Sequence, residues 1–74
     1  MYLAIDKRKI RQRLDLLELK HWWVAEMIGV NPSTLKRWLN GRINAARDEN
    51  VERLAQMLGT SSEEILTKRI KTLN

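Results

Sequence analysis

The side chains best suited to specific polar contacts lie close together near the middle of the chain. Ser33 and Thr34 are followed, within one helical turn, by the cations Lys36 and Arg37. Hydroxyl, ammonium and guanidinium groups at this spacing can hydrogen-bond a partner, but they form no pair of nucleophile and base. His21 is the only histidine of the sequence, which has no Cys and no glycine-rich phosphate loop. We therefore predict a binding protein without catalytic residues, with no metal site and no cofactor.

Two short helices with a sharp break between them are predicted to position these groups. Within residues 21–42 (HWWVAEMIGVNPSTLKRWLNGR), Gly29 suits a left-handed helix end, and Asn31 followed by Pro32 suits the start of the next helix. Such a pair is a helix-turn-helix, which we expect at about residues 21–40. Its two apolar faces consist of Val24, Ala25 and Ile28, and of Leu35, Trp38 and Leu39.

The second helix of this pair has a polar face that fits the major groove of DNA. At about 100° per residue, its apolar face is centred on Leu35, and Ser33, Arg37 and Asn40 lie on the opposite side. The other polar side chains of the helix flank that side. Residues near the N-terminus of a helix approach the base edges when the helix enters a major groove. The pattern therefore indicates that this helix, residues 32–39, contacts DNA bases.

The rest of the chain is predicted to add three helices and no strand. Asp6 is a candidate cap for a helix from about residue 7 to residue 17, and residues 51–58 form another amphipathic helix. Ser61 and Glu64 have the spacing of a capping box, which predicts a fifth helix. We expect an all-α bundle of five short helices in one domain over residues 1–74, with residues 1–5 as an N-terminal arm and residues 67–74 as a tail or helix extension. The apolar residues expected to face the interior are Ile10, Leu14, Leu17, Val51, Leu54, Ala55, Leu58, Ile65 and Leu66.

The charge of the chain points to a polyanionic partner. The net charge is +5 and the sequence pI is about 10.1. Residues 1–20 hold six basic and three acidic residues, and residues 21–47 hold four basic residues against one acid. Residues 48–66 carry five acids and one Arg. A charge run is often only a solvated face, but here the positive charge lies on and before the helix-turn-helix.

The sequence gives no sign of a membrane partner. No apolar run approaches the roughly 20 residues that a membrane-spanning helix needs. The opening residues MYLAI are too short for a signal peptide and precede the charges rather than follow them. The absence of Cys fits a reducing compartment. We expect a cytoplasmic protein of a bacterial or phage-infected cell.

The segment AEMIGVNPSTLKRWLNGR resembles the helix-turn-helix of the phage Cro and repressor family, also called the xenobiotic-response-element type. The segment LAQMLGTSSEEIL further along is similar to the fourth helix and the capped fifth helix of that family. The resemblance covers nearly the whole chain and implies a lambda-repressor-like DNA-binding fold. The matching positions are Ala25, Gly29, Leu35, Trp38, Asn40 and Gly41.

The resemblance also implies a set of DNA contacts. The family's base-contacting positions fall on Pro32, Ser33 and Arg37, and Pro32 cannot donate a hydrogen bond. Direct reading of the bases is therefore expected from Ser33, Thr34, Lys36 and Arg37. The residues expected at phosphates are His21, Asn31, Asn40, Arg42 and Asn44.

The function implied by the resemblance is sequence-specific binding of double-stranded DNA by a transcriptional regulator. The expected form is a small Cro-like repressor that binds as a homodimer to a palindromic operator. Its half-sites would lie about one helical turn apart.

Three departures from the family pattern concern the helices and the turn between the first two. His21 stands where the family usually has Gln, and Lys20 and Glu18 stand where a capping residue and Gly are common, so we expect the turn between these helices to differ. Leu14 and Leu39 replace an Arg–Glu pair of some members. Replacing a buried ion pair with apolar groups is often neutral or stabilising, so this departure agrees with the fold.

Trp22 and Trp23 fit neither the core nor the DNA face. Two adjacent residues cannot share one helix face, so at least one of these indoles needs another partner. One possibility is that the arm at residues 2–5 covers them. The other is a protein interface that also involves Ile70 and Leu73. That alternative would make the chain a DNA-binding antitoxin or a protein-interaction adaptor.

Overall fold

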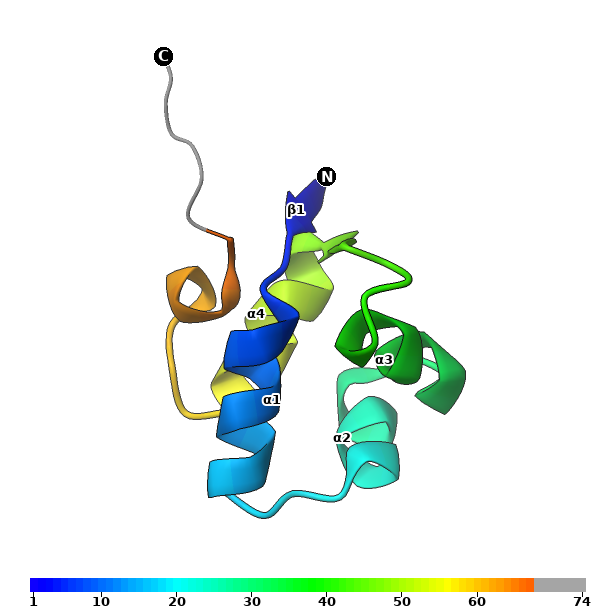
Figure 1. Ribbon diagram of the computed structural model, residues 1–74, viewed down its shortest axis with the longest axis vertical. Coiled ribbons are helices and arrows are strands. Elements are labelled where there is room, and N and C mark those ends of the chain that lie inside the picture. The colour runs from blue at the N-terminus through cyan, green and yellow to red at the C-terminus, as the bar shows by residue number, and fades with distance from the viewer. Residues whose placement is uncertain (68–74) are drawn as a thin grey trace.

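Two helices, α1 and α4, support the helix-turn-helix formed by α2 and α3 in the computed structural model (Figure 1). The structure describes residues 1–67. In this part of the chain α1 packs against α3, α4 packs against α2, and a short 3-10 turn, η1, contacts both α1 and α4. The elements are β1 (Tyr2–Ala4), α1 (Lys7–Leu16), α2 (His21–Ile28), α3 (Pro32–Leu39), β2 (Ala45–Arg47), α4 (Asp48–Met57) and η1 (Ser62–Ile65).

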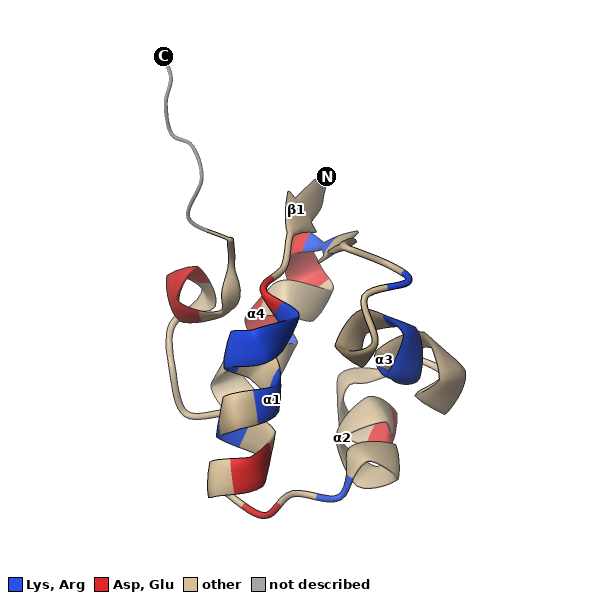
Figure 2. Ribbon diagram, viewed as in Figure 1, with Lys and Arg blue, Asp and Glu red and all other residues tan. Residues whose placement is uncertain are grey.

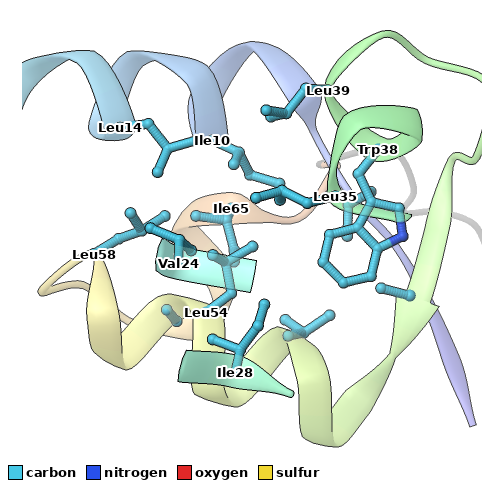
Figure 3. Packing of buried hydrophobic residues seen from close by; sticks show 14 of the residues in the cluster. Ile10, Leu14, Val24, Ile28, Leu35, Trp38, Leu39, Leu54, Leu58 and Ile65 are labelled. Carbon is cyan, nitrogen blue, oxygen red and sulfur yellow. The ribbon is translucent and has the colours of Figure 1, made fainter. Parts of the chain in front are cut away.

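One apolar core joins all of these helices (Figure 3). Every helix face predicted to be apolar in α2, α3 and α4 is buried, and no polar or charged residue is buried among residues 1–67. The burial of these faces fixes how the helices are rotated about their axes, because each has only one apolar side. The buried residues are Ile5, Ile10, Leu14, Val24, Ala25, Ile28, Leu35, Trp38, Leu39, Ala46, Val51, Leu54, Ala55, Leu58 and Ile65.

Helix α1 begins as predicted and ends one residue early. The Asp6 side chain accepts hydrogen bonds from the backbone N–H groups of Arg8 and Lys9, at 3.0 and 3.2 Å. The helix stops at Leu16, and Glu18 turns the chain with a positive φ of 54°. The prediction that Leu17 faces the core is therefore wrong, and its side chain is 42% exposed. Leu19 instead packs against the core after the turn.

A two-stranded sheet corrects the prediction that the chain has no strand. Strand β1 pairs antiparallel with β2, in the register Tyr2↔Arg47, Leu3↔Ala46 and Ala4↔Ala45. The predicted arm is thus a strand that packs against β2 and α4, not a cover for the two adjacent tryptophans. Each strand has three residues, which is too short to show an alternating pattern in the sequence.

The predicted fifth α-helix is a 3-10 turn of four residues. The predicted capping box does not form, because the Ser61 side chain makes no capping hydrogen bond. Ile65 is buried as expected, but Leu66 is extended and forms a β-bridge with Ile5. The backbone of Ile65 and Thr67 bonds to β1 and the residues after it, at 2.9 and 3.0 Å, so the helix cannot continue through Leu66. Ile70 and Leu73 lie outside the described residues, as does all but the start of the predicted tail at 67–74.

None of the helices in residues 1–67 is both long enough and apolar enough to cross a membrane.

The role of η1 in closing the core can be tested at Ile65. We expect Ile65→Val to lower the free energy of unfolding by about 0.5–1.5 kcal/mol and Ile65→Ala by about 2–5 kcal/mol, because this side chain is fully buried. Leu16→Ala is the matched control, since Leu16 is 72% exposed, and it should change stability by less than about 0.5 kcal/mol. Urea unfolding measures all three. Equal effects at the two positions would contradict the assigned core.

Candidate nucleic-acid interface

The turn between α2 and α3 sets the direction of the second helix. Gly29 ends α2 in the left-handed region, with φ 82° and ψ 28°, and its N–H donates to the carbonyl of Ala25 at 3.0 Å. The N–H of Val30 donates to the same carbonyl at 2.9 Å, and its side chain packs against the core. A Cβ at Gly29 would meet nothing closer than 3.9 Å, so the backbone conformation and not the available space requires glycine here.

The first turn of α3 is held by Asn31. Its Oδ1 atom accepts from the backbone N–H of Ser33 at 3.0 Å and from the Ser33 hydroxyl at 2.8 Å. Because both of these groups donate to Asn31, the lone pairs of the Ser33 oxygen remain able to accept a further hydrogen bond. The Asn31 Nδ2 group then remains as a free donor. The two side chains thus present an acceptor and a donor at the exposed start of α3.

The polar face of α3 lies opposite its buried face, as predicted. Ser33, Lys36 and Arg37 are exposed and Thr34 is half-buried. On the other side, Leu35, Trp38 and Leu39 are 1%, 3% and 4% exposed. The core contact therefore fixes which side chains α3 presents to a partner.

The C-terminal end of α3 is tied to the loop after it and to α1. Asn40 Oδ1 accepts from the backbone N–H of Arg42 at 3.0 Å. Arg11 of α1 donates from Nε to the carbonyl of Leu39 at 2.9 Å. A cation at this place is favourable because the last carbonyls of a helix carry partial negative charge. This contact could not be predicted from local sequence patterns, because Arg11 and Leu39 are 28 residues apart in the chain.

Lys7 lies beside the same end of α3. A Cβ at Gly41 would be 2.6 Å from the Lys7 Nζ atom, and the φ of Gly41 is 83°. Lys7 and Arg11 are one helical turn apart on α1, so they extend the basic surface of α3 onto α1. Sequence reasoning did not select either residue. Their i, i+4 spacing next to the apolar stripe of α1 is the signal that could have found them.

A hollow of about 440 Å³ lies between the start of α2 and the length of α3. Its walls combine apolar groups with cationic or hydrogen-bonding groups, and no carboxylate lines it. It brings together three of the predicted DNA contacts, His21, Lys36 and Asn40. The lining residues are Arg11, His21, Trp22, Pro32, Lys36, Leu39 and Asn40.

The other predicted contact residues lie around this hollow or beyond it. Arg42 lies in the loop after α3, beyond Asn40 and Gly41, and is exposed. Asn44 stands just before β2, where its carbonyl accepts from the N–H of Ile5 at 3.0 Å and its side chain is exposed. Figure 2 shows the basic residues on α1, on α3 and in the loop after it, and acidic residues on η1 and at the start of α4.

The two adjacent tryptophans differ in their surroundings. Trp22 is 58% exposed and lines the hollow next to α3. Trp23 is 39% exposed and is not part of that lining. Met27, one turn after Trp23, is 59% exposed, so these two side chains form an apolar strip on another side of α2.

Arg47 is a further cation near the start of α4. Its Nε donates to the Tyr2 hydroxyl at 3.4 Å, and its guanidinium lies 5.7 Å from the centre of the Tyr2 ring. The hydrogen bond to Tyr2 is the main reason that the pKa of Arg47 is raised above its ordinary value. Arg47 therefore contacts Tyr2 through its side chain as well as through the strand pairing.

Comparisons with known proteins agree with this geometry. A family model described as "Helix-turn-helix" matches residues 24–65. Comparison with curated proteins finds no match. Among solved structures, apo-HppE matches with a TM-score of 0.72 and 24% identity, over 82% of this chain and 34% of that one. FeII HppE in complex with substrate matches with a TM-score of 0.73 and 24% identity, over 92% of this chain and 39% of that one.

The two solved structures show a likeness of fold. The chain spans between a third and two-fifths of their length. At this identity the likeness extends to the arrangement of the helices and not to what those proteins bind.

The cap at the start of α3 can be tested by removing its side chain. We expect Asn31→Ala to lower the free energy of unfolding by about 0.5–2 kcal/mol, because two hydrogen bonds at the first turn of α3 are lost. Asn44→Ala is the control, since that side chain is exposed, and we expect a change below about 0.5 kcal/mol. Thermal and urea unfolding measure both. A loss no larger for Asn31 than for Asn44 would show that the cap does not hold α3.

Proposed function

The chain belongs to the helix-turn-helix DNA-binding family of the Cro and repressor type, and on this premise we propose that it is a sequence-specific transcriptional repressor. It binds double-stranded DNA with α3 in the major groove. The observation that carries the proposal is the division of α3 into a buried apolar side and an exposed polar side. The groups on the polar side are the ones that hydrogen-bond base edges.

Arg37 is the main base-reading residue in this proposal. Its guanidinium can bond the N7 and O6 atoms of a guanine at the same time. With its hydroxyl donating to Asn31, Ser33 accepts, and in this arrangement it selects a base with an exocyclic amine in the major groove, which is adenine or cytosine. Lys36 and Thr34 contact the neighbouring positions.

Phosphate contacts surround this reading face. His21 and Asn40 lie at the hollow between α2 and α3, and Arg42 follows α3. Asn31 donates from its free Nδ2 group, and Asn44 reaches the backbone from the loop before β2. Lys7 and Arg11 add cations on α1. Such contacts increase affinity for all sequences and make it depend on salt.

Repression would follow from steric occlusion of a promoter. Two copies would occupy the half-sites of a palindromic operator about one helical turn apart, which matches the two-fold symmetry of a homodimer.

The exposed strip of Trp23 and Met27 favours a second candidate function, a DNA-binding antitoxin or adaptor that holds another protein. In that case Trp23→Ala would remove binding of the partner and Arg37→Ala would not. Under the repressor proposal, Arg37→Ala is the damaging change.

Selection of bound duplexes from a random pool tests the proposed function. We expect an enriched site with two inverted half-sites, each containing a guanine read by Arg37 next to an adenine or cytosine read by Ser33. Arg37→Ala should weaken binding to that site by about 1–3 kcal/mol and relax the preference for guanine. Fluorescence anisotropy with labelled duplex measures the affinity.

Arg13→Ala is the matched control for the loss of one positive charge. Arg13 lies on the side of α1 next to Glu64 of η1, away from the α3 face. Its replacement should leave the selected site unchanged. A pool in which no duplex is enriched would overturn the proposed function.

A further inference from the structure

Trp22 is an exposed indole on the same surface as the proposed DNA contacts. It is 58% exposed, and it forms one wall of the hollow that also includes His21, Lys36 and Asn40. Trp23 is its natural comparison, because it is the next residue in the chain and its side chain lies outside the hollow. The two tryptophans therefore do not form one surface.

The walls of the hollow suit a ligand that is partly apolar and partly anionic. Trp22, Pro32 and Leu39 provide apolar surface, while Arg11 and Lys36 provide positive charge. No carboxylate is part of the lining to repel an anion. One nucleotide of a DNA strand has this combination, because its deoxyribose is largely apolar and its phosphate is charged.

The beginning of α2 adds donors at the same place. Lys20 is the residue just before α2, and its side chain makes no capping hydrogen bond. The first backbone N–H groups of α2 therefore have no capping partner from Lys20. The first bond of α2 within the helix runs from the N–H of Val24 to the carbonyl of Lys20. The N–H groups of His21 and Trp22 precede it, at the end of the helix that favours an anion.

We propose that the hollow seats one nucleotide of the sugar–phosphate backbone of bound DNA, with the indole of Trp22 packed against the deoxyribose. This inference rests on the proposed function and assigns Trp22 to the DNA interface. Arg11 and His21, which also line the hollow, hold the adjoining phosphate. Trp23, together with Met27, remains outside the interface. The contact of Trp22 carries no base information, so it contributes equally to every DNA sequence.

Tryptophan fluorescence tests this assignment, because Trp38 is buried and the other two indoles can be removed one at a time. In Trp23→Phe, addition of a mixed-sequence duplex at low salt should reduce acrylamide quenching of the remaining exposed indole, Trp22, by about half or more. In Trp22→Phe, the same duplex should leave the quenching of Trp23 unchanged. Protection of Trp23 without protection of Trp22 would overturn the proposal.

Affinity gives an independent readout with a matched pair of variants. We expect Trp22→Ala to weaken binding of all duplexes about fivefold to tenfold, while Trp23→Ala stays within about twofold of the parent chain. The salt dependence of binding should stay unchanged in Trp22→Ala, because no charge is lost, and it should decrease in Arg42→Ala, which removes a proposed phosphate contact. Thermal unfolding of each variant checks that the fold is intact.

The outcomes separate this proposal from the function on which it rests. If the parent chain binds duplex DNA while Trp22 stays open to acrylamide, or if Trp22→Ala binds as well as the parent chain, the seating of the nucleotide is wrong and the proposed function stands. If the parent chain binds no duplex, both proposals are overturned.

Discussion

The packing of α3 onto the core is the interaction on which the rest of the structure depends. Leu35, Trp38 and Leu39 are buried in the core where α3 packs against α1 and α2, so the helix cannot rotate about its axis without exposing them. Burial of these side chains is what directs Ser33 and Arg37 outward. Trp38 is the largest of the three, and truncating a buried Trp typically costs about 3–5 kcal/mol. An outward polar face is thus a consequence of a buried apolar one.

Hydrogen bonds hold α3 at each of its two ends. Asn31 fixes the first turn through two hydrogen bonds, and Arg11 bonds the last carbonyl from α1. The same two residues also set the local electrostatics, because Asn31 orients the Ser33 hydroxyl and Arg11 adds charge beside the hollow. Structure and proposed recognition therefore use the same contacts. Basic residues lie on α1 and α3, while acidic residues lie on η1 and at the start of α4, with Asp15 near the end of α1 and Glu26 on α2 (Figure 2).

Features that depend on local sequence patterns could be predicted from the sequence. Features that depend on contacts between segments far apart in the chain could not. The bounds of α2 and α3, the Asp6 cap and the apolar faces of α2, α3 and α4 follow from helical spacing and capping residues, and these are confirmed. The strand pair could not be predicted, because three residues show no alternation and the pairing joins Leu3 to Ala46. The failure of the fifth helix has the same origin, since β1 bonds to the backbone around Leu66. For the candidate site, helical spacing predicts the exposed polar face of α3, whereas the packing of α1 is what brings Lys7 and Arg11 beside that helix.

The central claim is that one face of the molecule, formed by α3, the start of α2 and the adjoining side of α1, binds DNA. Amide chemical-shift mapping by NMR tests it most directly, with isotope-labelled protein and a mixed-sequence duplex. The predicted result is that addition of DNA causes the largest chemical-shift changes in residues 21–22 and 32–42 and at Lys7 and Arg11. The amide signals of residues 48–52 and 62–65 should keep nearly the chemical shifts of the free protein. Shifts concentrated on the acidic residues of α4 and η1, or no shifts at all, would contradict the account.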